Sequence, residues 1–115
     1  MKKLEAIIQP FMLMDVKGAL AEIGVTVLTV SEVREADRRG RHTETYRGQE
    51  YTVDFTARVK LEAVVADCRA DETIAVITRA VKSEHDGAGT IFVYALEDAV
   101  SIQTGQTRLE HQMTP

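Results

Sequence analysis

The sequence has little of what several protein classes need. It holds one cysteine, Cys68, in 115 residues, so an internal disulfide is excluded and a reducing compartment is indicated. No apolar run approaches the roughly 20 residues that cross a bilayer, so membrane insertion is not expected. Glu5 and Gln9 interrupt the apolar stretch that a signal peptide would need after the first lysines. We therefore expect a cytoplasmic protein.

Patterns typical of catalysis and metal binding are also missing. There is no catalytic triad, no paired-carboxylate site and no phosphate-binding GxxxxGK motif. The histidines at 42, 85 and 111 show no metal-ligand spacing. The net charge of −4 argues against nucleic acid as a partner. The sequence predicts no enzyme, no metal site and no nucleic-acid binding.

What is present is the composition and periodicity of one globular domain covering residues 1–115. Hydrophobic residues make up 44% and charged residues 28%, which is ordinary for such a domain. Alternation predicts strands and 3.6-residue spacing predicts helices. The strands are predicted at 3–9, 25–33, 51–65 and 90–96, and the helices at 13–23 and 68–82. This β-α-β-β-α-β order is typical of the ferredoxin-like α+β fold.

Particular residues bound these elements. Pro10 cannot donate to a sheet and ends the first strand, Gly24 is placed to end the first helix, and Asp67 is a plausible N-cap of the second. Apolar faces are predicted on both helices and on the strands at 3–9 and 51–65. They comprise Leu4, Ala6 and Ile8; Leu13, Val16, Ala19, Leu20 and Ile23; Val53, Phe55, Ala57, Val59, Leu61, Ala63 and Val65; and Ala70, Ile74, Ile77, Thr78 and Val81.

Two helices can cover only one face of a four-stranded sheet. We place Ile7, Val30 and Val64 on the other face, among polar residues. Because an exposed apolar sheet face is a liability, this pattern is a hint of oligomerisation.

The second and third predicted strands are separated by a charged loop of about 17 residues without periodicity, which a ferredoxin-like hairpin does not need. This stretch runs from Arg34 to Glu50 and leads into "HTETYRGQEYTVDF" at 42–55. Long loops in compact domains are usually functional or disordered, so a solvated insertion remains an alternative.

Three motifs resemble the PII signal-transduction family, trimeric regulators of nitrogen metabolism. They are "MKKLEAIIQPF" at the N-terminus, "HTETYRGQEYTVDF", and "GAGTIFVY" at 87–94. The resemblance extends from residue 1 to about residue 98. It implies a homotrimer whose T-loop, residues 37–55, docks on target proteins such as a membrane transporter or a biosynthetic enzyme. Residues 105–115 would form a polar tail.

Within the T-loop, Tyr51 matches the tyrosine that is uridylylated in some bacterial members, and Arg47, Gly48 and Glu50 match the surrounding motif. An exposed tyrosine offers a nucleophilic hydroxyl and a large contact surface. Strand-edge packing at the base of the loop is the alternative for Tyr51.

The resemblance also implies an adenine-nucleotide site in the clefts between subunits. Base and ribose contacts are carried over to Thr29, Glu62 and Val64. Arg38 matches a phosphate contact, and two glycines allow backbone N–H groups to approach a phosphate. These glycines are Gly87 and Gly89.

The family usually places three basic residues near the phosphates. In this sequence their positions are occupied by Thr90, Ser101 and Gln103. Ala88 likewise replaces an acidic residue. Because charge-assisted hydrogen bonds are worth about 1.5–3 kcal/mol each, the loss disfavours a triphosphate. ADP or AMP is therefore predicted to be favoured over ATP, unless a cation at 39, 41 or 108 compensates.

The effector region differs as well. Arg39 stands where the family's glutamine helps to hold magnesium, and an arginine cannot ligate a cation. Arg58 stands where a lysine pairs with 2-oxoglutarate, and can still bind a carboxylate. Glu35 and Ala36 replace a glycine and an aromatic residue. We expect Arg58 to be a weak effector-anion site and magnesium to contribute little.

Two functions therefore remain open. One is a PII-like regulator that binds an adenine nucleotide and controls a partner through its T-loop. The other is a trimeric interaction protein that has lost nucleotide sensing. Minor features also have two interpretations: His85 and Asp86 as anion contacts or a solvated turn, and Cys68 as a reactive thiol or a half-buried packing residue.

Overall fold

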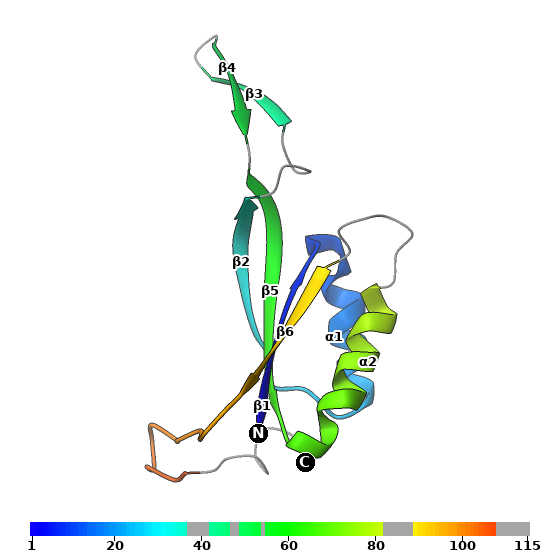
Figure 1. The fold of residues 1–115 in the computed structure, drawn as a ribbon, viewed down its shortest axis with the longest axis vertical. Coiled ribbons are helices and arrows are strands. Elements are labelled where there is room, and N and C mark those ends of the chain that lie inside the picture. Colours follow the sequence, from blue (N-terminus) through cyan, green and yellow to red (C-terminus); the bar gives the residue numbers. More distant parts are fainter. Residues whose placement is uncertain (37–41, 47–48, 54, 82–88, 108–115) are drawn as a thin grey trace.

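The computed structural model describes residues 1–36, 42–46, 49–53, 55–81 and 89–107, and for 42–46 and 49–53 the backbone alone. Four antiparallel strands form a sheet in the order β2-β5-β1-β6, and both helices lie on one of its faces (Figure 1). The strands are β1 (Lys2–Ile8), β2 (Thr29–Ala36), β5 (Phe55–Val65) and β6 (Gly89–Ala95), and the helices are α1 (Leu13–Glu22) and α2 (Ala70–Val81). This arrangement confirms the predicted ferredoxin-like α+β fold.

The helix-covered face contains the core. Alternate residues of β1 and β5 point to it because side chains of a strand alternate between faces, as their spacing predicted. Helices α1 and α2 contribute the facing layer. The buried hydrophobic residues are Leu4, Ala6, Ile8, Met12, Val16, Leu20, Val25, Val59, Leu61, Ala63, Val65, Ala70, Val76 and Ile77. From the same predicted faces, Phe55 and Ala57 are exposed, because β5 extends there beyond the helices.

Helix α1 is bounded as the sequence indicated. Pro10 opens a single 3-10 turn, Pro10–Met12, that leads into the helix. At the other end Gly24 adopts φ +83, its N–H donates to the carbonyl of Ala21 at 3.0 Å, and the N–H of Val25 donates to that of Leu20 at 2.9 Å. This is a Schellman motif, which requires a residue with positive φ.

The same cap corrects the predicted start of the second strand. Val25 is buried and used in the helix cap, so β2 begins only at Thr29 and continues to Ala36, beyond the predicted 33. The register also corrects the position of Val30, which pairs with Leu61 and so lies on the helix-covered side. Ile7 pairs with Lys60, and Val64 with Lys3, both on the uncovered face.

Helix α2 starts differently from the prediction. A 3-10 turn, Asp67–Arg69, precedes it, and Asp67 makes no capping hydrogen bond. Its carboxylate instead pairs with the Met1 amino group at 2.9 Å, which lowers the pKa of Asp67 through a hydrogen bond and charge attraction. The Asp67 N-cap prediction was therefore wrong, because the N-terminal cation is the closer partner.

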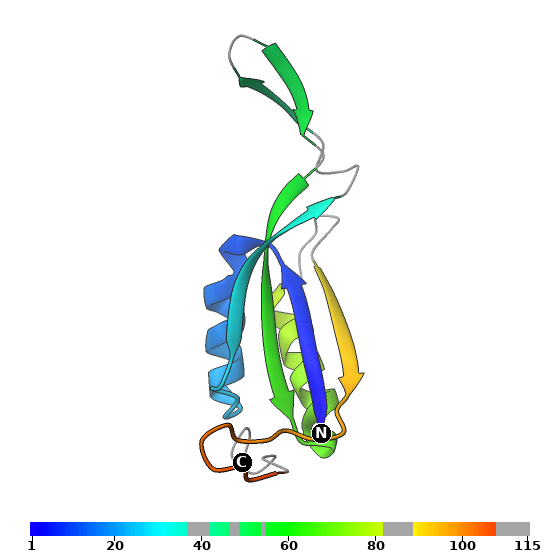
Figure 2. The same ribbon diagram turned by 90° about the vertical axis from the view of Figure 1, so that its left-hand side faces the viewer.

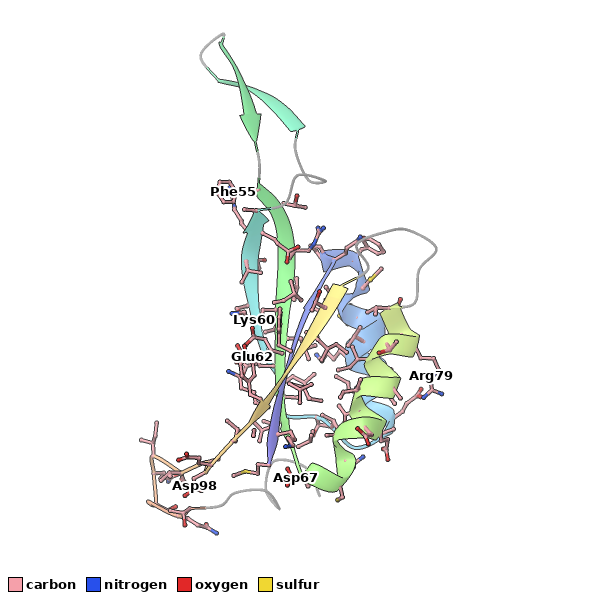
Figure 3. All side chains as sticks on the ribbon, in the orientation of Figure 1. Phe55, Lys60, Glu62, Asp67, Arg79 and Asp98 are labelled. Carbon is pink, nitrogen blue, oxygen red and sulfur yellow. The ribbon has the colours of Figure 1, made fainter. Side chains whose placement is uncertain are left out.

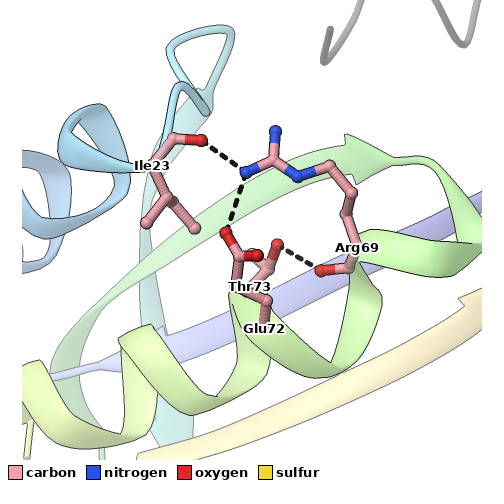
Figure 4. Close-up of polar contacts among 4 residues, drawn as sticks. All are labelled: Ile23, Arg69, Glu72 and Thr73. Carbon is pink, nitrogen blue, oxygen red and sulfur yellow. Dashed lines mark hydrogen bonds and ion pairs between the residues drawn. The ribbon is translucent and has the colours of Figure 1, made fainter.

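The two helices are tied together at this end by Arg69. Its guanidinium donates to the carbonyl of Ile23, just past α1, and to Glu72 at 2.9 Å (Figure 4). Thr73, which is fully buried, donates its hydroxyl to the Arg69 carbonyl at 2.8 Å. That bond lets a polar residue enter the core.

The buried stripe of α2 is also rotated from the predicted one. Thr73 and Val76 are buried, whereas Thr78, predicted to face the core, is exposed. Cys68, expected to be half-buried, is exposed as well.

A separate two-stranded sheet lies beyond the upper ends of β2 and β5, away from the helices (Figure 1). It consists of β3 (His42–Tyr46) and β4 (Gln49–Val53), paired antiparallel. We call β3 and β4 the arm. Regular pairing was not predicted here, and the single strand expected at 51–65 is divided between β4 and β5.

Candidate functional site

The uncovered face of the sheet, which faces the viewer in Figure 2, carries a ladder of charged side chains. Glu5 of β1 lies directly opposite Glu62 of β5, an arrangement that is repulsive by itself. Lysines on both sides compensate: Lys3 approaches Glu62 at 2.7 Å and Glu5 at 3.9 Å, and Lys60 approaches Glu5 at 3.9 Å. Figure 3 shows Lys60 and Glu62 on the side of the sheet opposite the helices.

Among the lysines of this ladder, Lys3 makes the closest contact with a carboxylate. The hydrogen bond that it donates to Glu62 raises its pKa above the usual 10.5, with a smaller contribution from the charges nearby. Its ammonium also lies 5.6 Å from the centroid of the Tyr94 ring, within cation–π range. The uncovered face thus combines paired charges with exposed aromatic rings.

Three of the predicted nucleotide contacts lie together on this face. Thr29 pairs with Glu62 across β2 and β5, and Val64 is two residues farther along β5, on the same face. Thr29 is exposed, and Glu62 and Val64 are half-buried. The structure therefore groups the residues predicted to contact base and ribose.

Gly89 lies on the opposite edge of the sheet, in β6, beside Ile8. Strands β5 and β1 separate β2 from β6, which at about 4.8 Å per spacing puts the two edges roughly 14 Å apart. Gly89 has φ +150, and an added Cβ would lie 2.5 Å from the Ile7 carbonyl oxygen, so only glycine fits. One copy of the chain does not bring Gly89 and Thr29 together.

The positions without the expected cations are also dispersed. Thr90 is exposed at the start of β6, whereas Ser101 and Gln103 follow the other end of that strand. The chain there leaves the sheet on the side away from the helices (Figure 1). A turn closes it, with the Ser101 N–H donating to the Gln106 carbonyl and the Gly105 N–H to that of Ser101, each at 2.8 Å.

The predicted effector residue Arg58 already has an anionic partner. Its Nε lies 3.6 Å from Glu35 Oε1, and its Nη1 donates to the Ala57 carbonyl at 3.1 Å. Glu35 and Thr56 face each other across β2 and β5. The Thr56 hydroxyl is buried without a hydrogen-bond partner in the part of the chain that the structure describes.

Other predicted residues lie outside the described ranges. Arg38, Arg39, Arg47, Gly48 and Gly87 belong to this group, as do Arg41, His85, Asp86, Ala88 and Arg108. Glu50 and Tyr51 are described by their backbone alone, as residues of β4 opposite Thr45 and Glu44. Tyr51 is thus part of the arm. It lies in β4, beyond the ends of β2 and β5 that form the base of the arm.

A groove of about 800 Å³ lies between α2 and β6, on the helix side of Gly89. Its described lining is mostly apolar, with Arg79 as the charged member; the apolar side chains are Ile8, Ile74, Ala75, Ile77, Val81 and Ile91. Such a groove suits an apolar group and offers little to a phosphate.

Sequence reasoning missed two features of the uncovered face. Phe92 and Tyr94 are 46% and 44% exposed and stand opposite Glu5 and Lys3. The alternation of "TIFVYAL" held that signal, since strand residues two apart share a face. The contact between Glu35 and Arg58 was missed because it depends on the register of β2 against β5.

Among the described residues, no group of three or more His, Cys, Asp or Glu side chains is arranged to hold a metal ion. No described helix is long and apolar enough to span a bilayer.

Comparison with known proteins identifies the family. The family model described as nitrogen regulatory protein P-II matches residues 1–106. Proteins named nitrogen regulatory protein P-II from Rhodospirillum rubrum and Rhodobacter capsulatus are 49% and 50% identical over 106 and 107 residues, covering 92% and 93% of this chain and 95% and 96% of theirs. Nitrogen regulatory protein P-II 1 of Escherichia coli is 47% identical over 106 residues, 92% of this chain and 95% of its own. The chain therefore belongs to the nitrogen regulatory P-II family of signalling proteins.

Proposed function

We propose that the chain forms a homotrimer that binds an adenine nucleotide between subunits and controls a partner protein through residues 37–55. Family membership supports a regulatory role. The observation that carries the proposed site is the separation of its halves: Thr29 and Glu62 lie near one sheet edge and Gly89 at the other. A cleft that uses both needs the β2 side of one copy and the β6 side of another.

The chemistry of the two halves fits different parts of a nucleotide. Thr29 and Glu62 offer hydroxyl and carboxylate oxygens to ribose or base, beside the apolar side chain of Val64. Gly87 and Gly89 bring backbone N–H groups that suit one phosphate, and Arg38 is the cation for another. With threonine, serine and glutamine at 90, 101 and 103, a third phosphate lacks a counter-charge. ADP or AMP is the favoured ligand, with little need for magnesium.

Control of the partner is assigned to the arm and its flanking residues. Arg47, Gly48, Glu50 and Tyr51 are the proposed contact or modification residues. The arm lies beyond the sheet, away from the helices (Figure 1), so a partner can reach it without disturbing the core. A membrane transporter or a biosynthetic enzyme is the proposed class of partner.

Complementation between variants tests the shared site. Thr29→Glu places a carboxylate and added bulk in one half, and Gly87→Glu does so in the other. Each variant alone should lose ADP binding measured by calorimetry. Oligomers that mix the two variants contain some clefts in which both halves are intact, and these should recover binding with the original affinity.

Two results would contradict this account. Mixed oligomers that stay as inactive as the single variants would show that both halves come from one chain. Light scattering that gives the mass of a monomer at micromolar concentration would exclude the trimer. Both measurements use the full chain, with circular dichroism to confirm that each variant is folded.

The second candidate, an interaction trimer without nucleotide sensing, is favoured by the missing cations. It predicts a trimer by light scattering and no heat from ATP, ADP or AMP.

A further inference from the structure

The outward face of α1 carries a row of exposed apolar and small residues. The buried side of this helix, with Val16 and Leu20, packs on the sheet. The row lies on the opposite side and consists of Phe11, in the 3-10 turn that opens the helix, and of Met14, Gly18 and Ala21. The side chains of Phe11 and Met14 are 74% and 70% exposed. We call these four residues the α1 seam.

The spacing within the α1 seam is that of a helix that packs against another helix. Its members are three, four and three residues apart, which places them at the a and d positions of two consecutive heptads. A surface helix ordinarily has charged or polar residues on the face turned away from the core. The seam is therefore typical of a two-helix contact, with its large residues at the start of the helix and its small ones toward the end.

Gly18 is a second, independent observation that points to a helix at this place. A glycine inside a helix destabilises it relative to alanine and usually has a packing or functional reason. The described part of the chain supplies no such reason, because a Cβ built on Gly18 would have nothing within 4 Å. A glycine on an exposed helix face does allow another backbone to approach closely.

The charged residues that flank the α1 seam indicate which helix fits it. Lys17 borders one edge and Glu22 the other, at a g and an e position; both are exposed, and neither forms an ion pair with another described residue. In a parallel pair of α1 helices, the lysine of each copy meets the glutamate of the other. In an antiparallel pair like edges meet, which would gather the acidic residues Asp15 and Glu22 of both copies on one edge. The charges thus favour a second copy of this helix in parallel orientation.

We propose that the α1 seam packs in parallel against the α1 seam of a second copy and so joins one oligomer to the next. This contact goes beyond the proposed function, which concerns the sheet edges and the arm. Helix α1 begins at the end of the sheet nearest the arm (Figure 1), so a parallel contact keeps the arms of both copies at the same end. Two large and two small residues per copy bury less area than a stable interface needs, so the association is weak and depends on protein concentration.

Sedimentation of the full chain at protomer concentrations from about 10 µM to about 1 mM measures this association. We expect the mass to rise with concentration above that of the oligomer present at the lowest concentration. Met14→Lys should abolish the rise, because it places a charge inside the α1 seam. Ala75→Lys adds the same charge at an exposed position of α2, outside the seam, and should leave the rise unchanged.

Exchange of the flanking charges tests the partner and the orientation. Lys17→Glu sets acidic residues against each other across the contact and should weaken association about fivefold, and Glu22→Lys should do the same with basic ones. The double variant with both changes restores opposite charges across the contact if two copies pair in parallel. It should therefore associate as the unmodified protein does.

A mass that stays constant over the whole concentration range would overturn the proposal and leave the α1 seam to a helix of another protein. Equal loss of association in Met14→Lys and Ala75→Lys would also overturn it, as would a double variant that stays as weak as the single ones. Circular dichroism checks that each variant is folded, which we expect because every changed residue is exposed. None of these variants alters Thr29, Glu62 or Gly89, so ADP titration of the same samples reports on the proposed function separately.

Discussion

The two faces of the four-stranded sheet differ in what their side chains do. On the helix-covered face, β1 and β5 bury aliphatic residues such as Leu61 under α1 and α2. On the other face, Lys3 and Glu5 of β1 form a ladder of partly exposed ion pairs with Lys60 and Glu62 of β5. Burial of apolar area stabilises strongly, whereas exposed ion pairs contribute little. One face can therefore hold the fold while the other is available for ligands or further copies.

The largest effect should come from truncating the covered face. Leu61→Ala should lower the free energy of unfolding by about 2–5 kcal/mol, because Leu61 is 1% exposed and its removal leaves a cavity. Lys60→Ala, the adjacent residue on the other face, should change it by less than about 1 kcal/mol. Denaturant titration at one protomer concentration measures both. Equal losses would mean that the two faces contribute alike.

A second contrast concerns two glycines. Gly89→Ala should lower the free energy of unfolding by about 2–4 kcal/mol, because the new Cβ would lie 2.5 Å from the Ile7 carbonyl oxygen and the residue has φ +150. Gly18→Ala, on the exposed side of α1 with nothing within 4 Å, should raise it by about 0.5–1 kcal/mol. Thermal melting of both variants checks this prediction. A Gly89→Ala variant as stable as the parent would refute the close approach of β6 to β1.

The smallest effect should appear at alkaline pH. Because the Glu62 hydrogen bond raises the pKa of Lys3, its stabilisation is complete below the unfolded value of about 10.5 and is lost as pH rises through the folded value. Lys3→Met should therefore weaken the fall in melting temperature above pH 10.5, whereas Lys17→Met on exposed α1 should not. Identical alkaline profiles for the two variants would argue against the Lys3–Glu62 pair.

Strong periodicity made part of the fold predictable. The alternation of β1, and of β5 from Val59 to Val65, correctly predicted which residues are buried, and Gly24 marked the end of α1 correctly. The strand predicted at 25–33 was placed less well. It has apolar residues at both odd and even positions, so the sequence did not show which of them face the core. Other features depend on contacts between residues far apart in the sequence. Asp67, for example, pairs with the Met1 amino group and does not take its expected capping role.

The candidate site was less predictable than the fold. Motif resemblance pointed to Thr29, Glu62, Val64 and Gly89. The register then placed the first three on β2 and its neighbour β5 and Gly89 on the far edge strand β6, which no linear pattern reveals. The arm strands have few apolar residues and so gave no alternation. The Glu35–Arg58 pair arises from diagonal positions on different strands, which sequence spacing does not encode.

Calorimetric titration with ATP, ADP and AMP, each with and without magnesium and 2-oxoglutarate, tests the central claim most directly. We expect ADP or AMP to bind at least as tightly as ATP, because positions 90, 101 and 103 lack cations, and we expect little gain from magnesium or 2-oxoglutarate. A triple variant that restores the cations, with Thr90→Lys, Ser101→Arg and Gln103→Arg, should bind ATP more tightly than the parent does and gain less for AMP. Tight ATP binding by the unmodified protein, strengthened further by magnesium and 2-oxoglutarate, would contradict the account.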